Sequence, residues 1–461
     1  SAKKAKPRNQ YSQRYKMKRR DFLKFGGMAL GAAGAAGLPL TVRATMDQDY
    51  ESAILAEKPV YRPDGWKGAR VNYLEYPGGS FDINNPRQAD LNGCASLGSS
   101  TIVGPIARRR EIEGGFKRFD TGYYGDPAEL RKKAGAQYYS PMGDALVFGA
   151  RATGTEAMVD GTPRADKLPD PVTMARHIKD MAMFLGADDC GIGVLPIQAI
   201  YTHQTATYEE MRNGVPRAQE KEIVNTHPFA IVMLYNQDFK TTTMASNGYD
   251  GGTFGSRRAY LYNGIMSDVL ARYIRNFGYE ARSHHNENYQ VMVTPILIAA
   301  GMGELSRVGD CVLHPYLGYN YKAAVVTTNM PLMPDRPIEF GVQEFCRVCK
   351  KCAQLCPSKA ISMETEREPY NGYLKYPLDA QACTIFRRTN PEGYGCGRCA
   401  VVCPWSSKEE SWFHYLGSYL SSMKNSALNR LIVQMDDICG YGSEVATELK
   451  SWIGFTSVGR V

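Results

Sequence analysis

The chain has 461 residues, of which 43% are hydrophobic and 22% are charged, a composition typical of a globular protein with a large core. The net charge of +8 is concentrated at the start: residues 1–44 hold eleven Lys or Arg against Asp21 alone, so residues 45–461 carry a net charge of −2. The main part of the protein is therefore not basic, which argues against nucleic-acid binding.

Residues 1–44 have the pattern of an export signal. The run Lys-Arg-Arg-Asp-Phe-Leu-Lys at 18–24 precedes a Gly- and Ala-rich apolar stretch from Phe25 to Leu40, and Ala44 offers a small residue for cleavage. This arrangement predicts the twin-arginine route, which exports folded proteins. The apolar stretch is too short and too rich in glycine to span a membrane stably. The alternative is an amphipathic first helix with an accidental pair of arginines.

Residues 45–338 divide into an irregular part and a periodic part. Residues 45–165 are rich in Gly, Pro, Asp and Arg, and we expect irregular structure with short helices there, forming part of a substrate pocket. From 166 to 338 helical and strand patterns alternate, which predicts a layered α/β or α+β core, with a linker at 331–337. The expected helices span 172–185, 257–277 (ended by Gly278) and 293–300, and the expected strands span 190–194, 229–234 and 323–328.

Eight of the twelve cysteines lie between residues 346 and 403, in two runs that each end in Cys-Pro. This spacing is typical of bacterial ferredoxins with two four-iron clusters, in which the fourth cysteine of each run binds the other cluster. A zinc site or a disulfide framework is the alternative, but such sites seldom repeat this run. The crossed arrangement predicts one cluster on Cys346, Cys349, Cys352 and Cys403, and a second on Cys356, Cys383, Cys396 and Cys399.

The remaining cysteines and the nearby tryptophans have plainer interpretations. Trp405 and Trp412 follow the second run and are expected to pack around the clusters. Residues 339–410 would thus form the cluster domain, and 411–461 a C-terminal segment that packs on the core. Small buried hydrophobic roles are expected for Cys94, Cys190, Cys311 and Cys439.

Three parts of the chain resemble the respiratory reductive dehalogenases, exported enzymes that carry a corrinoid and two four-iron clusters. They are the signal at 18–24, the stretch from Thr328 to Ile361, and the motif Met-Asp-Asp-Ile-Cys-Gly-Tyr-Gly at 435–442. The resemblance covers about residues 18–40 and 166–445. It implies an α+β fold, with a nitroreductase-like cobalamin-binding core at 166–338 followed by a two-[4Fe-4S] ferredoxin-like domain at 339–410.

The resemblance also implies a reaction and a setting. The enzyme would replace a halogen of an organohalide by hydrogen, as the terminal step of an anaerobic respiration. Cobalamin would bind base-off with contacts within 260–330, since the chain lacks an Asp-x-His-x-x-Gly motif for a lower histidine ligand. The protein would lie peripherally on the outer face of the cytoplasmic membrane, with a small integral-membrane anchor subunit and a membrane electron donor, and a homo-oligomer is possible.

Three residues carry the implied catalytic site. Tyr260, on the long helix, would be the proton donor, with Tyr262 as the less favoured alternative. Lys322 would supply a cation, at a position where many respiratory members carry arginine, and Asn286 would orient the pair. The ammonium would favour the phenolate that proton transfer leaves behind.

Each of these residues also has a structural interpretation. A tyrosine on an apolar helix is usually a core residue with its hydroxyl on a backbone carbonyl. Lys322 could be a solvated residue at the end of a strand, and His284 and His285 are expected at the surface or behind the site.

Two rival functions remain open. Epoxyqueuosine reductase also combines cobalamin with two clusters, but it acts on tRNA in the cytoplasm, and both the export signal and the net charge of −2 over residues 45–461 argue against it. A non-catalytic two-cluster electron carrier would leave the residues before Cys346 without a role. Cobalt content separates the carrier from either enzyme.

Overall fold

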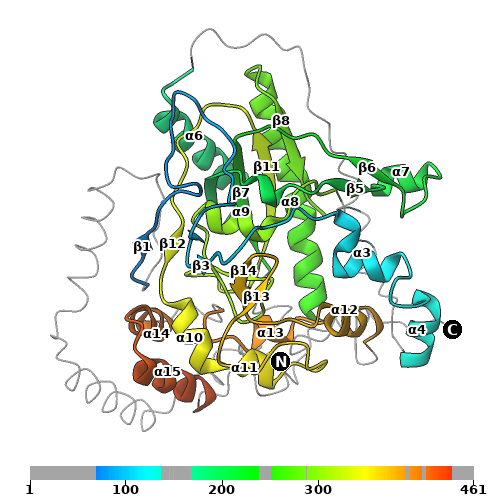
Figure 1. The fold of residues 1–461 in the computed structure, drawn as a ribbon, viewed down its shortest axis with the longest axis vertical. Helices are drawn as coiled ribbons and strands as arrows, with labels where there is room; N and C mark the ends of the chain where they lie inside the picture. The colour runs from blue at the N-terminus through cyan, green and yellow to red at the C-terminus, as the bar shows by residue number, and fades with distance from the viewer. Residues whose placement is uncertain are drawn as a thin grey trace, which may run out of the picture. The chain divides into compact units, whose positions relative to one another are not determined.

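A computed structural model describes residues 69–135, 145, 149, 168–237, 251–286, 288–390, 395–406 and 412–438 (Figure 1). Of the two compact units of the chain, 1–59 and 60–461, the described residues all belong to the second. The expected export signal at 1–44 lies outside the described residues, as do Cys439 and the side chain of Trp412.

A four-stranded antiparallel sheet forms the core, in the order β4-β7-β11-β8. β7 and β11 occupy its centre and pair along their whole length, from Tyr321 opposite Asn236 to Thr328 opposite Phe229. Both are almost continuously apolar, which is the pattern of strands covered on both faces. The strands are β4 (Asp189–Val194), β7 (Phe229–Asn236), β8 (Ala281–His284) and β11 (Tyr321–Thr328).

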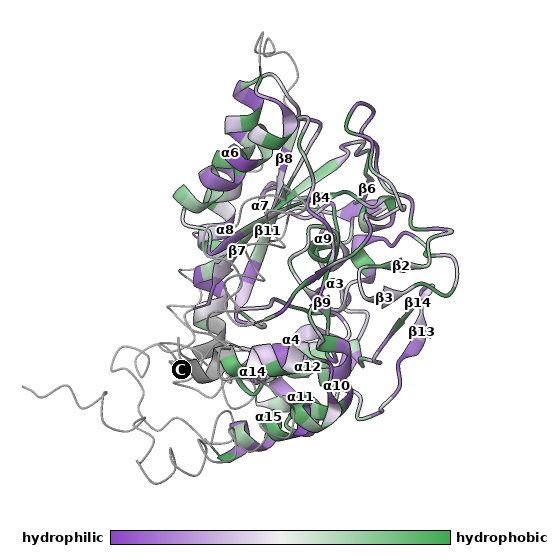
Figure 2. Cartoon of the chain, turned by 90° about the vertical axis from the view of Figure 1, so that its left-hand side faces the viewer, coloured by the Kyte–Doolittle hydropathy of each residue, from purple (hydrophilic) through white to green (hydrophobic). Residues whose placement is uncertain are grey.

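Helices cover the two faces of this sheet (Figures 1 and 2). α6 (Pro171–Phe184) and α8 (Gly251–Asn276) pack on the face that includes Ile231 and Val326. α9 (Val293–Ala299) packs on the opposite face, against Val232 and Val325. Because side chains alternate along a strand, neighbouring residues of one strand enter different hydrophobic cores. The α+β class predicted from the sequence is confirmed.

Local chemistry sets where these elements begin, end and approach one another. The Asp170 carboxylate accepts the backbone N–H groups of Val172 and Thr173 at 3.0 and 3.1 Å, which caps α6. Gly278 follows α8 with φ +82°, a left-handed conformation that favours glycine, so the predicted end of the long helix is confirmed. A Cβ at Gly193 in β4 would lie 2.8 Å from the Ala300 nitrogen, so glycine lets α9 approach the sheet.

Short elements surround this core. The described residues 69–135 have the irregular structure with short helices that their composition predicts. The remaining strands of the second unit form two-stranded pairs, of which β1 with β12 ties residue 72 to residue 339. These elements are β1 (Asn72–Tyr73), β2 (Ser96–Leu97), β3 (Ser100–Thr101), α3 (Gly115–Asp120), α4 (Pro127–Ala134), β5 (His203–Thr205), α7 (Tyr208–Arg212), β6 (Glu220–Glu222), β9 (Glu304–Leu305), β10 (Val312–Leu313), β12 (Ile338–Glu339), β13 (Glu368–Tyr370) and β14 (Tyr373–Lys375), with 3-10 turns η2 (Glu111–Glu113) and η3 (Ile197–Ala199).

The two cysteine runs lie in a group of helices that follows the sheet in the sequence and has its own hydrophobic core. Trp405 is buried there, with its ring 5.1 Å from that of Phe340 and 6.0 Å from that of Phe345. Its core also includes Cys346, Cys356 and Cys403, so Trp405 packs beside the cysteines, as expected. The helices are α10 (Val342–Cys349), α11 (Lys351–Gln354), α12 (Ala380–Thr389), α13 (Arg398–Val401), α14 (Trp412–Ser422) and α15 (Ser426–Ile438).

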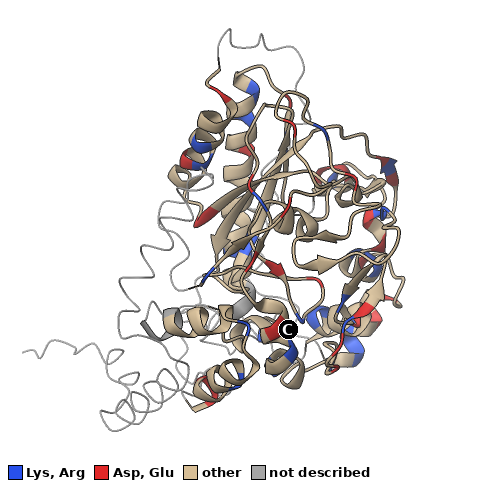
Figure 3. Ribbon diagram, turned by 60° about the vertical axis from the view of Figure 1, so that its left-hand side comes forward, with Lys and Arg blue, Asp and Glu red and all other residues tan. Residues whose placement is uncertain are grey.

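A buried ion pair ties the segment 331–337 to the sheet. The Lys179 ammonium on α6 donates to both carboxylate oxygens of Asp335, at 2.7 and 2.6 Å, and both side chains are buried. Asp335 also accepts the N–H of Ile192 in β4 at 2.8 Å. Elsewhere charges of both signs are mixed along the outer helices and loops (Figure 3). The segment expected to be a linker is therefore held firmly against the core.

Asp335→Ala should destabilise the protein by about 3–5 kcal/mol, because it leaves a buried ammonium without its partner. Lys179→Met combined with Asp335→Asn should recover part of this loss, since no charge is then buried and the amide oxygen can still accept from Ile192. The measurement is denaturant unfolding of the anaerobically purified protein. Lys221→Ala is the control: it breaks the exposed Lys221–Glu210 pair and should cost about 0–1 kcal/mol. Equal effects of Asp335→Ala and Lys221→Ala would contradict the importance of the buried pair.

Candidate active site and cysteine domain

The first predicted set of cysteines lies together. Cys346 and Cys349 are on α10, Cys352 is on α11, and Cys403 follows α13. Burial, and then the nearby thiols of Cys346, Cys403 and Cys349, raise the pKa of the Cys352 thiol well above its usual value. A left-handed residue between the two helices, Lys350 with φ +57°, reverses the chain so that the sulfurs on both helices can face one site.

The second predicted set lies together as well. Burial, and then the thiols of Cys396 and Cys356, raise the pKa of the Cys399 thiol to about 11. Burial, with added repulsion from Cys399 and Cys356, likewise raises the pKa of Cys383 to about 11. The Cys399 thiol also contributes to the raised pKa of Cys352 in the first set, so the two sets are close enough to interact electrostatically.

This crowding fits two iron–sulfur clusters. Eight thiols packed in a buried region repel one another when ionised, and bound iron removes that cost because it ligates the thiolate form. Within each predicted set some thiols influence one another, with Cys403 acting on Cys352 and Cys356 acting on Cys383 and Cys396, and cysteines of both sets share one hydrophobic core. Their role as ligands stays a prediction.

The other described cysteines differ in their surroundings. Cys190 is buried in β4 among apolar side chains, as expected. Cys94 is partly exposed, and its thiol lies 3.2 Å from the Asp90 carbonyl oxygen, so the expected buried role is wrong for Cys94. Cys311 is partly exposed as well, so the expected buried role is wrong for it too, and it packs against the hydrophobic core that contains the cysteine runs.

Tyr260 and Lys322 meet where α8 crosses β11. The Lys322 ammonium nitrogen lies 5.3 Å from the centroid of the Tyr260 ring. Lys322 stands near the start of β11, opposite Tyr235, and both Tyr260 and Lys322 are half-buried. Lys322 is also one of the charges that favour the thiolate of Cys399. The predicted pair thus joins α8 to the central strand β11.

The other two predicted residues are not part of this pair. The Tyr262 side chain is 44% exposed and lies under the Arg258 guanidinium, 5.8 Å from its ring centroid. Asn286 lies in the turn after β8, and among the described residues its side chain makes no hydrogen bond to Tyr260 or Lys322. The structure therefore joins Tyr260 to Lys322 and leaves Asn286 outside the contact.

Two neighbours of Tyr260 were not predicted. Burial, and then the nearby Tyr260 and Tyr201, raise the pKa of the Tyr289 hydroxyl well above its usual value. Asn263 follows Tyr260 by three positions on α8, is fully buried, and has no partner for either amide atom within the described part of the chain. Helical spacing places Asn263 on the face of Tyr260 and could have identified it, whereas Tyr289 is brought in by a loop that carries no sequence signal.

His284 and His285 are both buried, so a surface position is wrong for them. His284 Nε2 lies 3.0 Å from the Thr327 hydroxyl oxygen, and Nδ1 lies 2.6 Å from a nitrogen of the Arg282 guanidinium. Burial, and then the charge of Arg282, lower the pKa of His284 well below 6.5, so the ring is neutral near pH 7. The histidines lie inside because β8 pairs with β11, opposite Val325 and its neighbours.

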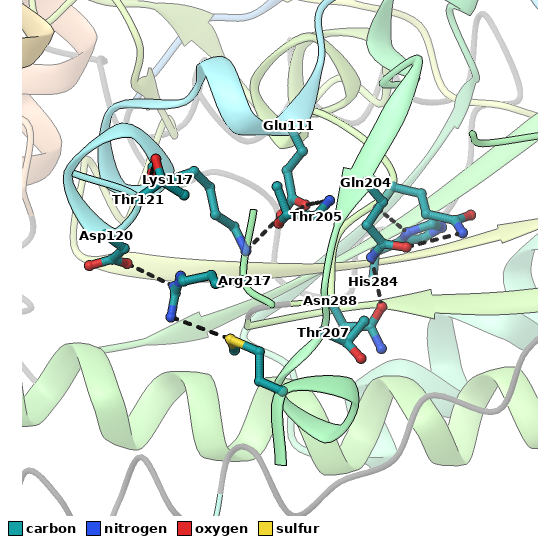
Figure 4. A network of polar contacts seen from close by, with 12 residues as sticks. Glu111, Lys117, Asp120, Thr121, Gln204, Thr205, Thr207, Arg217, His284 and Asn288 are labelled. Carbon is teal, nitrogen blue, oxygen red and sulfur yellow. Dashed lines mark hydrogen bonds and ion pairs between the residues drawn. The ribbon is translucent and has the colours of Figure 1, made fainter. Parts of the chain in front are cut away.

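A polar network holds the loop after β8 in place (Figure 4). The Asn288 side-chain oxygen accepts from the Arg282 guanidinium at 2.6 Å and from the Gln204 amide at 3.0 Å. On the neighbouring elements Glu111 accepts from the Thr205 hydroxyl at 2.7 Å. Because Asn288 lies between residues 286 and 289, this network fixes the loop that brings Tyr289 beside Tyr260.

Comparisons with known proteins show which families the chain resembles. Residues 345–406 match the 4Fe-4S double cluster binding domain family. The tetrachloroethene reductive dehalogenase of Sulfurospirillum multivorans is 32% identical over 303 residues, 60% of this chain and 58% of that protein. That of Dehalobacter restrictus is 32% identical over 196 residues, 40% of this chain and 34% of that protein.

The chain is also similar to solved structures of reductive dehalogenases. The catabolic reductive dehalogenase NpRdhA aligns with a TM-score of 0.66 at 31% identity, over 79% of this chain and 50% of that one. A second reductive dehalogenase structure, described by a mechanism for B12-dependent dehalogenation, aligns with a TM-score of 0.66 at 32% identity over the same shares. Epoxyqueuosine reductase of Lactococcus garvieae is 28% identical over 147 residues, 28% of this chain and 37% of that protein.

The chain thus spans between about a third and three-fifths of the reductive dehalogenases it matches. The similarity to the first of these relatives extends over 303 residues at 32% identity, and that to the solved structure over 79% of this chain at 31% identity. The chain is therefore similar to reductive dehalogenases over part of their length, and its residues 345–406 match the 4Fe-4S double cluster binding domain family.

Proposed function

We propose that the protein is a reductive dehalogenase that uses cobalamin and two [4Fe-4S] clusters to replace a halogen of an organohalide by hydrogen. The position of Lys322 carries the proposal. Its ammonium lies 5.3 Å from the ring centroid of Tyr260 and also favours the thiolate of Cys399. The Lys322 ammonium thus interacts with both the candidate proton donor, Tyr260, and a cysteine of the set that would bind an electron-carrying cluster.

The eight cysteines would hold the clusters in the crossed arrangement. Cys346, Cys349, Cys352 and Cys403 form one ligand set, and Cys356, Cys383, Cys396 and Cys399 form the other. When bound, the clusters supply electrons one at a time and the corrinoid supplies the carbon–halogen chemistry. The influence of Lys322 on Cys399 supports the second set as the one closer to the proposed active site.

Buried polar atoms without partners support a large polar ligand next to Tyr260. Both amide atoms of Asn263 are in this state within the described residues, as is the side-chain oxygen of Asn320, two positions before Lys322. A buried polar group without a partner is costly, so such atoms indicate a missing hydrogen-bonding group. The amide side chains of a corrinoid would satisfy them, so the residues present fit this cofactor.

In the proposed mechanism Tyr260 donates its hydroxyl proton to the carbon that loses the halogen. The phenolate that remains is an anion in a partly buried site, and Lys322 stabilises it from across the ring. Tyr289, held by the loop network, packs beside Tyr260 and limits the access of water to it. Substrate identity would depend on the surrounding residues, and residues 45–165 are the proposed source of part of that pocket.

The proposed setting rests on the sequence. The paired arginines at 18–24 support export by the twin-arginine route, and the family resemblance supports a peripheral position on the outer face of the cytoplasmic membrane beside a small anchor subunit. Among the described residues, no helix combines the length and apolar character that a membrane crossing needs.

Tyr260→Phe should lower the rate of halide release by about 10²–10⁴-fold, because the proton donor is lost while the ring remains. Iron and cobalt contents should stay unchanged. The assay is anaerobic halide release with a chemical reductant and a panel of chlorinated and brominated aliphatic and aromatic compounds. Tyr262→Phe tests the alternative donor and should keep the normal rate. A Tyr260→Phe enzyme that releases halide at the normal rate would rule out the proton-donor role.

Lys322→Gln should be nearly as damaging as Tyr260→Phe, because the phenolate loses its cation, whereas Lys322→Arg should recover part of the rate. The same halide assay, measured across pH, checks both variants. A recovered rate of halide release in Lys322→Arg, but not in Lys322→Gln, shows that the positive charge matters rather than the length of the side chain. A Lys322→Gln enzyme with the wild-type rate and pH profile would remove Lys322 from the mechanism.

A further inference from the structure

Arg307 is the largest fully buried side chain in the described part of the protein. Its Nε donates to the carbonyl oxygen of Cys346 at 2.8 Å, and Nη1 donates to the carbonyl oxygens of Ser362 and Glu364 at 2.9 and 2.7 Å. The guanidinium carbon lies 4.0 Å from the ring centroid of Tyr376. Every one of these partners is electrically neutral.

This guanidinium therefore lacks a counter-ion among the described residues. No carboxylate there forms an ion pair with Arg307, and its Nη2 has no hydrogen-bond partner. Burial of a cation without an anion is costly, and carbonyl oxygens compensate for it only in part. The 2.8 Å hydrogen bond from Nε to the Cys346 carbonyl oxygen places the guanidinium beside the first cysteine set, whose ligated thiolates would supply the missing negative charge.

The second cysteine set has an arginine of its own. Arg387 follows Cys383 by four positions on α12, so the two side chains lie on one face of the helix. Its guanidinium carbon lies 4.6 Å from the Phe116 ring centroid. Among the described residues it too forms no ion pair with a carboxylate.

Arg388, the next residue on α12, provides a control for Arg387. The Arg388 guanidinium lies over the same Phe116 ring, at 4.9 Å, but it is 2.9 Å from the Asp120 carboxylate. Its charge is therefore neutralised locally. Two adjacent arginines thus share a helix and an aromatic contact and differ in whether a carboxylate balances them.

We propose that Arg307 and Arg387 are the counter-cations of the two clusters, and that each positions its own cluster and raises its reduction potential. Arg307 serves the cluster on Cys346, Cys349, Cys352 and Cys403, and Arg387 serves the cluster on Cys356, Cys383, Cys396 and Cys399. The inference rests on the proposed ligand sets and does not require dehalogenation.

The electrostatics give the direction of the effect. Each cluster accepts one electron from an external one-electron reductant, no bond to the protein forms or breaks, and the cluster with its four thiolates becomes more negative by one charge. A fixed cation stabilises this more negative form, which makes reduction easier.

The test is a potentiometric titration of the anaerobically reconstituted full chain, with the reduced clusters followed by electron paramagnetic resonance. Arg307→Gln should shift the midpoint potential of one cluster to more negative values and leave the other in place. Arg387→Gln should shift the other cluster in the same direction. Arg388→Gln, which removes a neutralised charge, should shift neither.

Unchanged potentials in both Arg307→Gln and Arg387→Gln, with full iron content, would overturn the proposal, as would equal shifts in Arg388→Gln. If Arg307→Gln fails to retain iron, Arg307→Lys decides: the retained charge should preserve both clusters near their wild-type potentials, and loss of iron in this variant too would refute charge compensation by Arg307. Because the readout is a potential, a wild-type protein that holds both clusters but releases no halide would contradict the proposed function and leave this test intact.

Discussion

The contact between the Lys322 ammonium and the Tyr260 ring, where α8 crosses β11, is the interaction on which the proposed chemistry depends. The same ammonium favours a thiolate of the second cysteine set, so in the proposed function one cation would serve both the proton donor and the electron input. This contact depends on the crossing of α8 over β11, which places a residue from the middle of the helix over the start of the strand. A small rotation of either element would separate the pair.

The rest of the structure holds that crossing in place. The two central strands are buried on both faces, with α6 and α8 on one side and α9 on the other, so their register is fixed by alternating side chains. The Lys179–Asp335 pair ties α6 and β4 to the segment that leads into the cysteine domain. Arg307, in the segment after β9, donates a hydrogen bond to the carbonyl oxygen of Cys346. The cysteine domain is therefore joined to the core by buried polar contacts as well as by packing.

Sequence reasoning succeeded where the physical signal is periodic or evenly spaced. The apolar repeats predict both ends of α6 and the end of α8 to within one residue, although α8 begins six residues before the predicted start, and the two Cys-Pro runs predict the region that matches a double cluster domain. It did not find contacts between residues far apart in sequence: Tyr289 reaches Tyr260 through a loop network, and Arg307 and Arg387 were not identified because charge balance is visible only in three dimensions. His284 and His285 were expected at the surface as one alternative, but the pairing of β8 with β11 buries them.

The most direct test of the central claim is a metal count followed by reduction. The full chain, purified without oxygen in the presence of corrinoid, should contain about eight iron atoms and about one cobalt, and a one-electron reductant should reduce both kinds of centre. Addition of an organohalide should then re-oxidise the cobalt centre as halide is released. A protein with iron and sulfide but no cobalt would contradict the account and would identify an electron carrier.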